Sequence, residues 1–181
     1  NEVCSQLVAG MPALLQSSVI KDDINGTIDV RWAKPAGLDT IPQTGPFEYR
    51  ISRTPGLFTE SGEETLITKI ADSLEDTVFI DSEVNTIEMP LAHSYEVALY
   101  YDGQPLSDLS ALETASSFYP ELIGNDNKIT LTMRKNVPWI NYDYTIYRRN
   151  SVSGEFDSIA FTTAETFTDT GLKNEQEYCY R

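Results

Sequence analysis

Short runs of alternating apolar and polar residues recur along the whole chain, separated by clusters of Gly, Pro, Asn and Asp. Such alternation places successive side chains on opposite faces of a strand, and helical periodicity is nearly absent. The runs that we interpret as strands are 28–32, 47–51, 65–70, 77–80, 95–99 and 106–114, then 128–133, 142–148, 156–161, 166–168 and 178–181. The pattern predicts an all-β fold of the sandwich type.

The series of runs starts twice, which predicts two units of the same kind joined by a linker at 116–120. Residues 49–53 (YRISR) match 144–148 (YTIYR), and 79–82 (FIDS) match 167–170 (FTDT). In each unit a tyrosine follows a turn and opens the next run, Tyr95 in the first and Tyr178 in the second. We expect both hydroxyls to hydrogen-bond back to the preceding turn, as in the tyrosine corner of sandwich domains.

These features resemble tandem immunoglobulin-like modules of the fibronectin type III family. The resemblance rests on Ile28-x-Val30-x-Trp32, Tyr49-x-Ile51 and the corner tyrosines. The second unit departs from the family pattern, because Met133 stands where the core Trp is expected. The resemblance implies the tail of a preceding module at 1–10, one module at 11–116, and a second module at 117–181 that lacks its last strand.

More narrowly, the chain is similar to module arrays of Bacteroidetes surface proteins associated with gliding motility and sorted by type IX secretion. The phrases that carry this likeness are Asn1-Glu2-Val3-Cys4, Val137-Pro138-Trp139, Ile146-Tyr147-Arg148, Gly171-Leu172-Lys173-Asn174 and Tyr178-Cys179-Tyr180. The likeness implies an extracellular or outer-surface location and a non-catalytic role as spacer and in adhesion or protein–protein contact. The implied partners are neighbouring modules of the same chain, other surface proteins or glycans.

The composition excludes several classes of function. The chain has 181 residues, with 28 Asp plus Glu against 13 Lys plus Arg, and a formal net charge of −15. This charge argues against nucleic-acid binding, because phosphates would be repelled. The 40% of hydrophobic residues is too high for a disordered acidic tail, and no run approaches the roughly 20 apolar residues of a membrane span. The chain opens without Met and stops inside an alternating run, so we expect it to be part of a longer protein.

The two cysteines, Cys4 and Cys179, lie near opposite ends of the sequence. The family fold implies that each forms a disulfide with a cysteine of a flanking part of the same protein, outside residues 1–181. A Cys4–Cys179 bridge is the alternative, and it requires Cα atoms within about 7 Å. Two modules placed end to end would hold these residues tens of ångströms apart. A disulfide at each position fits an oxidising compartment.

Candidate chemistry in the sequence is sparse. The single histidine, His93, is expected in an exposed turn, and no Gly-x-Ser-x-Gly elbow or phosphate-binding Gly-rich loop is present. We therefore expect no enzyme activity, no cofactor and no metal. Calcium at 22–25 (DDIN) or 125–127 (NDN) is the alternative, since these turns supply oxygen ligands.

Exposed aromatic residues and short modification signals complete the candidates. Alternation directs Tyr100 and Tyr147 outward, and Trp139 follows a proline, so these rings are candidates for stacking on sugars or on a protein. This supports an alternative function as a carbohydrate-binding accessory module of a glycan-degrading system. Asp-(Ser/Thr)-aliphatic triplets, which resemble an O-glycosylation signal of Bacteroidetes exported proteins, occur at Thr40, Ser73, Thr77 and Ser158. Four copies exceed the roughly one expected from composition.

Overall fold

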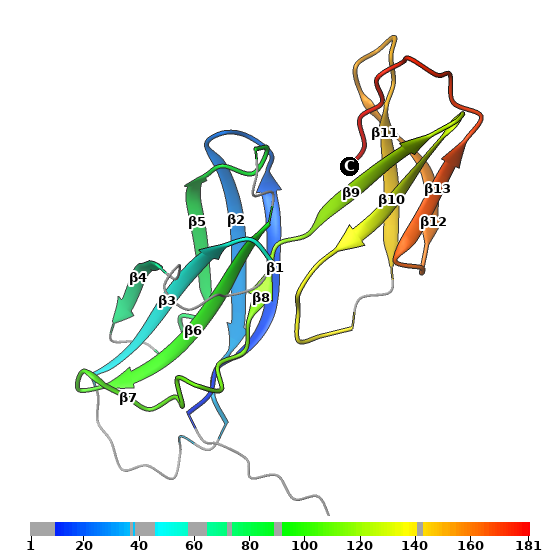
Figure 1. The fold of residues 1–181 in the computed structure, drawn as a ribbon. Coiled ribbons are helices and arrows are strands. Elements are labelled where there is room, and N and C mark those ends of the chain that lie inside the picture. The colour runs from blue at the N-terminus through cyan, green and yellow to red at the C-terminus, as the bar shows by residue number, and fades with distance from the viewer. Residues whose placement is uncertain are drawn as a thin grey trace, which may run out of the picture. The chain divides into compact units, whose positions relative to one another are not determined.

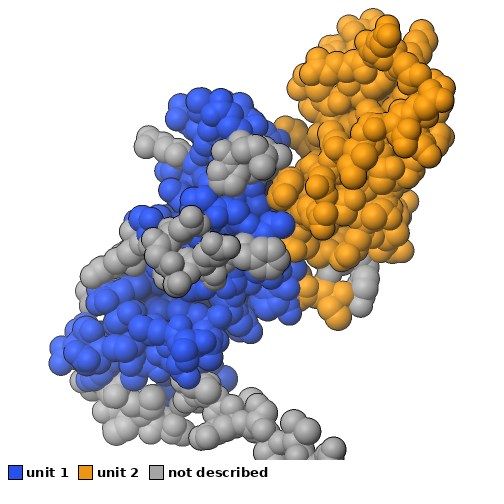
Figure 2. All heavy atoms as spheres, in the orientation of Figure 1, with its two compact units in different colours: residues 1–117, 136–138 blue, residues 118–135, 139–181 orange. Residues whose placement is uncertain are grey.

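The computed structural model describes residues 10–36, 38, 46–57, 65–71, 74–88, 92–140 and 143–181. Within these residues the chain is all-β, with strands β1 to β13 as labelled in Figure 1. It divides into two compact units, residues 1–117 with 136–138 and residues 118–135 with 139–181, which Figure 2 shows in two colours. The predicted fold class is therefore confirmed.

The first unit is made of two antiparallel sheets. Its strands are β1 (Ala13–Lys21), β2 (Gly26–Ala33), β3 (Phe47–Pro55), β4 (Thr65–Ala71), β5 (Val78–Val84), β6 (His93–Tyr101), β7 (Gln104–Pro105) and β8 (Ala115–Ser116). One sheet has the order β1-β2-β5 and the other the order β4-β3-β6-β7, with β8 also pairing with β6. This arrangement is that of an immunoglobulin-like sandwich.

The core of the first unit lies between the two sheets. Ile28, Val30 and Trp32 alternate along β2 and are at most 2% exposed. The Trp32 ring meets the Tyr49 ring of β3 edge to face, with centroids 5.3 Å apart, a geometry that aromatic pairs favour. The Tyr49 hydroxyl donates to the carbonyl of Leu74 at 3.1 Å, and burial raises the pKa of Tyr49 to about 12. These contacts join the inner faces of both sheets.

Strand β1 is absent from the sequence prediction because its apolar residues occur in adjacent pairs. The register of β1 against β2 shifts between Leu14 and Gln16 and again between Val19 and Lys21. At each shift the strand has an extra residue, so Leu15 and Ile20 are exposed while Leu14 is buried. The two bulges thus remove the alternation that would have indicated a strand.

The strand expected at 106–114 differs from the structure. On the edge of β6 away from β3, strand pairing is limited to the short β7 and β8, on either side of this segment. Between them, the N–H groups of Leu106 and Ser107 both donate to the Leu99 carbonyl, at 2.8 and 3.2 Å. The Thr114 hydroxyl donates to Glu96 of β6 at 2.9 Å, so the segment is attached to β6 by separate hydrogen bonds instead of a ladder.

The second unit repeats the arrangement on a smaller scale. Its strands are β9 (Tyr119–Asn125), β10 (Lys128–Arg134), β11 (Tyr144–Arg149), β12 (Phe156–Thr162) and β13 (Thr166–Thr170). One sheet has the order β13-β10-β9, and β11 pairs with β12 in the other. An isolated bridge joins Tyr180 to Arg148, on the edge of β11 away from β12.

Four buried residues form the core of the second unit. Leu131 and Met133 of β10 pack with Tyr144 and Ile146 of β11. Met133 is 4% exposed, so the thioether occupies the interior position that the family pattern gives to Trp. The two sheets of this unit therefore also enclose an apolar interior.

The predicted linker at 116–120 is shorter in the structure. Strand β8 ends at Ser116 and β9 begins at Tyr119, and the division between the compact units falls after Ser117. Alternation did not predict β9, which contains Pro120 and Gly124. Strand β9 lies at the edge of its sheet, where a proline is tolerated.

Candidate functional site

A buried aspartate connects the two sheets of the first unit. Asp81 lies on β5 with 7% of its side chain exposed. Its Oδ2 accepts hydrogen bonds from Arg53 Nη1 on β3 at 2.6 Å and from the Tyr95 hydroxyl on β6 at 2.9 Å. Tyr95 is fully buried, and burial together with the charge of Asp81 raises the pKa of its hydroxyl. Both bonds are made to a charged acceptor, which makes them stronger than neutral ones.

The second unit contains the same three residue types in the same geometry. Asp169 on β13 accepts hydrogen bonds at its Oδ2 from Arg148 Nη1 at 2.7 Å and from the Tyr180 hydroxyl at 2.9 Å. Burial and the nearby carboxylate raise the pKa of the Tyr180 hydroxyl. We call these two groups the Arg–Asp–Tyr clusters. Their carboxylates are bound by structural partners within their own unit.

The Arg–Asp–Tyr clusters show which residues of the two units are equivalent, and the expected match between Tyr95 and Tyr178 is wrong. We expected Tyr95 to match Tyr178 and to bond back to its turn, whereas the Tyr95 hydroxyl donates to Asp81. Its structural counterpart is Tyr180, and His93 then corresponds to Tyr178. The connection from Asp81 to Tyr95 is three residues longer than that from Asp169 to Tyr180, so spacing along the sequence does not align the two tyrosines.

Tyr178 and His93 occupy equivalent positions, each two residues before the tyrosine of its cluster. The Tyr178 hydroxyl accepts a hydrogen bond from the Lys173 N–H at 2.9 Å, in the preceding turn. In the first unit, His93 Nε2 lies 2.9 Å from the carbonyl oxygen of Asn85, which assigns the proton to Nε2. His93 is 7% exposed, so the expectation of an exposed turn histidine is wrong. Burial lowers the pKa of His93.

The three candidate aromatic residues lie in different environments. Tyr100 is half-buried, with the Arg50 guanidinium 3.6 Å from its ring centroid. Trp139 is half-buried as well. Tyr147 is 37% exposed and lies on the outer side of β11, opposite the buried Ile146. Sequence reasoning missed Phe161, which is 67% exposed on β12.

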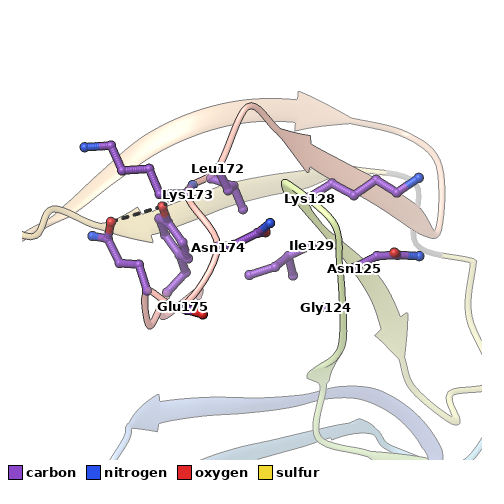
Figure 3. A pocket seen from close by; sticks show the side chains of 10 residues that line it. Gly124, Asn125, Lys128, Ile129, Leu172, Lys173, Asn174 and Glu175 are labelled. Carbon is purple, nitrogen blue, oxygen red and sulfur yellow. Dashed lines mark hydrogen bonds between the residues drawn. The ribbon is translucent and has the colours of Figure 1, made fainter.

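An open pocket of about 290 Å³, with both polar and apolar residues in its lining, lies at one end of the second unit. Figure 3 shows its walls, which come from the turn between β9 and β10 and from the segment after β13. Lys128 and Lys173 extend to opposite sides of the hollow, and neither forms an ion pair with a described residue. Asn125, Glu175 and the Tyr178 ring are also part of the lining, which offers hydrogen-bonding groups and an aromatic ring to hydroxyl groups.

The turns considered for calcium use their oxygen atoms locally. Asp23 Oδ1 accepts a hydrogen bond from the Asn25 N–H at 2.9 Å, and Asp126 Oδ1 accepts one from Asn174 Nδ2 at 2.7 Å. Such bonds are the usual reason for Asp and Asn in turns. Among the described residues, no group of three or more His, Cys, Asp or Glu side chains is placed to hold a metal ion.

Several predicted sites lie outside the described residues, namely Cys4, Thr40 and Ser73. Cys179 is a half-buried free thiol in the structure, and its carbonyl accepts a hydrogen bond from the Arg149 N–H at 2.9 Å. Of the other modification candidates, Thr77 is half-buried before β5 and Ser158 is exposed on β12.

Comparisons with known proteins are limited to the fold. No protein-family model matches the chain, and no curated protein matches it. Among solved structures, it is similar to the central fibronectin-III array of RIM-binding protein, with 12% identity and a TM-score of 0.37. That alignment covers 94% of this chain and 61% of the other.

The sheet order decides the assignment. The chain is a tandem of two immunoglobulin-like β-sandwiches. None of the described residues belongs to a helix with the length and apolarity needed to cross a membrane.

Proposed function

We propose that the two modules are non-catalytic spacer and interaction domains of a secreted or cell-surface bacterial protein. The observation that carries this proposal is the repeated Arg–Asp–Tyr cluster, which uses the same three side chains in each module to join its sheets. Modules that repeat the same internal cross-links are typical of scaffolds, in which function resides in the groups that the scaffold carries.

The surroundings of the buried carboxylates support a non-catalytic role. Catalysis needs an acid, base or nucleophile held in a cleft. Asp81 and Asp169 are bound within their clusters, and Asp29, which is 6% exposed, accepts from Arg31 at 2.8 Å. These interactions hold each carboxylate against its own structural arginine.

Two experiments test this role. Purified protein should show no saturable turnover of glycoside, ester, peptide or phosphate substrates. In the full-length protein, replacing both modules by two unrelated sandwich modules of equal length should preserve export and display of the neighbouring domains. Turnover that disappears with a single substitution would contradict the non-catalytic assignment, and loss of display would contradict the spacer role.

The cellular location is part of the same proposal. The phrases shared with gliding-motility-associated arrays support export by type IX secretion, disulfides at Cys4 and Cys179, and O-glycosylation at Thr40, Ser73, Thr77 or Ser158. Protease treatment of intact host cells should remove the protein from the surface. Mass spectrometry of native material should show a glycan on at least one of the four sites and a disulfide at each cysteine. Unmodified peptides across all four sites would exclude the glycosylation.

Carbohydrate binding is a second candidate function. It is favoured by the open pocket lined by Asn125, Lys128 and the Tyr178 ring, and by the exposed Tyr147. Shallow sites with amides and aromatic faces suit sugar hydroxyls. A glycan array should then give a signal that is lost with Tyr147→Ala, Trp139→Ala or Tyr178→Ala. An array without any signal would contradict carbohydrate binding and leave the spacer role as the remaining proposal.

A further inference from the structure

One face of the second unit is aromatic and basic. Tyr144 and Ile146 point into the core, so the alternate residues of β11 point outward. The outward positions of the hairpin pair Thr145 with Phe161, Tyr147 with Ser158, and Arg149 with Phe156. None of these six positions holds Asp or Glu. We call this surface, centred on Tyr147, Arg149, Phe156 and Phe161, the aromatic–basic face.

Two guanidinium groups flank the Phe156 ring on this face. Those of Arg149 and Arg181 each lie 5.1 Å from the ring centroid. Arg181 is held there by backbone hydrogen bonds of 2.8 and 2.9 Å to Tyr147. A guanidinium that lies over an aromatic ring still has N–H groups that can donate to a carboxylate. Arg149 forms no ion pair with a described residue. The face is therefore prepared for carboxylates beside apolar groups.

The charge of the chain is unequally divided between the units. In sequence, the first unit has six Lys and Arg against 19 Asp and Glu, a net −13. The second unit has seven against nine, a net −2, which completes the total of −15. When two copies meet, the first unit of one copy is therefore the more acidic partner for the aromatic–basic face of the other.

The first unit also has apolar residues to match the exposed aromatic rings. Val78 and Ile80 are 46% and 47% exposed at outward positions of β5, which is an edge strand of its sheet. Asp76, which is exposed, comes two residues before Val78. We call Asp76, Val78 and Ile80 the β5 face. It combines apolar contact area with a carboxylate, as the aromatic–basic face combines it with guanidinium.

We propose that the aromatic–basic face of one copy docks on the β5 face of a second copy. Phe161 and Tyr147 cover Val78 and Ile80, while Arg149 meets the acidic surface of the first unit. Because the two surfaces differ, the contact is heterologous and joins copies head to tail. This inference goes beyond the spacer role, since modules can act as spacers without self-association.

Sedimentation velocity of the purified chain tests the proposal directly. At low salt, the average mass should rise with protein concentration between about 10 and 500 μM, the range of weak interfaces. Added salt of about 0.5 M should weaken the association several-fold, because it screens the contribution of the charges. A chain that stays monomeric across this range at low salt overturns the proposal and leaves the spacer role intact.

Matched variants locate the two surfaces. Arg149→Glu and Phe161→Ser should each weaken association at least tenfold. Lys173→Glu makes the same change in charge outside the face, and Ile123→Ser removes an exposed apolar residue of β9, so neither control should change association. Circular dichroism should show that all four variants retain the native fold. Association that is unchanged by Arg149→Glu and Phe161→Ser overturns the proposal.

A mixture of two defective variants separates the heterologous contact from a symmetric one. Arg149→Glu retains an intact β5 face, and Ile80→Lys retains an intact aromatic–basic face. Each variant alone should be monomeric, and the equimolar mixture should form a one-to-one dimer that does not extend. A mixture that remains monomeric, or in which either variant alone still forms chains, overturns the proposed pair of surfaces.

Discussion

Replacing Asp81 by Asn is expected to destabilise the first unit by about 3 kcal/mol. The substitution keeps the size of the side chain and removes the charge that accepts from Arg53 and Tyr95. It leaves the Arg53 guanidinium without its counterion at a position where 27% of that side chain is exposed. It also gives the fully buried Tyr95 hydroxyl a weaker acceptor.

The magnitude follows from the environment of each bond. Hydrogen bonds to charged groups contribute about 1.5–3 kcal/mol, and removing one partner of a buried pair costs about 3–5 kcal/mol. The partial exposure of Arg53 allows water to reach the freed guanidinium, which places the expected value at the lower end. In the second unit, Asp169→Asn should cost less, about 2 kcal/mol, because Tyr180 is only half-buried.

Urea unfolding followed by tryptophan fluorescence measures this effect. The first unit contains Trp32 and the second contains Trp139, so Trp139→Phe leaves a single fluorophore that is 2% exposed in the first unit. In that background, an m-value of about 1.5 kcal/mol per M converts 3 kcal/mol into a decrease of about 2 M in the urea midpoint.

Asp76→Asn provides the matched control, because it makes the same chemical change at an exposed position. It should alter the unfolding free energy by less than about 0.5 kcal/mol. A double-mutant cycle with Arg53→Met should give a coupling energy of about 1–3 kcal/mol. If Asp81→Asn costs no more than Asp76→Asn, or the coupling is zero, the structural role of the cluster is refuted.

Three further outcomes are expected. Burial lowers the pKa of His93, so the unfolded chain binds a proton at a higher pH than the folded chain does. The urea midpoint of the first unit should therefore decrease below a pH of about 6.5, and His93→Gln should remove this pH dependence. Gly26→Ala should cost more than about 2 kcal/mol, since a Cβ there would lie 2.4 Å from Thr86 Oγ1, whereas Gly124→Ala, which meets open space, should be tolerated in thermal melts. Tyr178→Phe should lower the unfolding free energy of the second unit by about 1 kcal/mol through loss of the turn hydrogen bond, and an unchanged Trp139 transition would contradict this.

Much of the fold is readable from the sequence where strands alternate regularly. The runs at 28–32, 47–51 and 95–99 lie in β2, β3 and β6, which supply most of the first core. Strand β1 is hidden by two bulges, because each adds a residue and places two apolar side chains next to each other. Strand β9 is hidden because an edge strand can contain Pro and Gly.

The Arg–Asp–Tyr clusters were not predicted, although their residues occur at matching places in the sequence. Arg53 with Arg148 and Asp81 with Asp169 occur in the repeated phrases. Alternation predicts which side of a strand faces inward, and it does not indicate that an inward aspartate is paired with an arginine from the other sheet. The longer connection before Tyr95 then hid its match with Tyr180. Exposure of Phe161 depends on the bulge between β11 and β12, which local pattern does not reveal.

Amide hydrogen exchange of the intact chain, read by mass spectrometry, tests the two-module account most directly. We expect two separately protected cores, one in β2, β3 and β6 and one in β10 and β11, because backbone hydrogen bonds under buried side chains open least often. Leu131→Asp should abolish protection in β10 and β11 and leave that of β2, β3 and β6 unchanged. Loss of protection in both units together, or exchange of β10 and β11 at unfolded-chain rates in the unmodified protein, would contradict two sandwich modules.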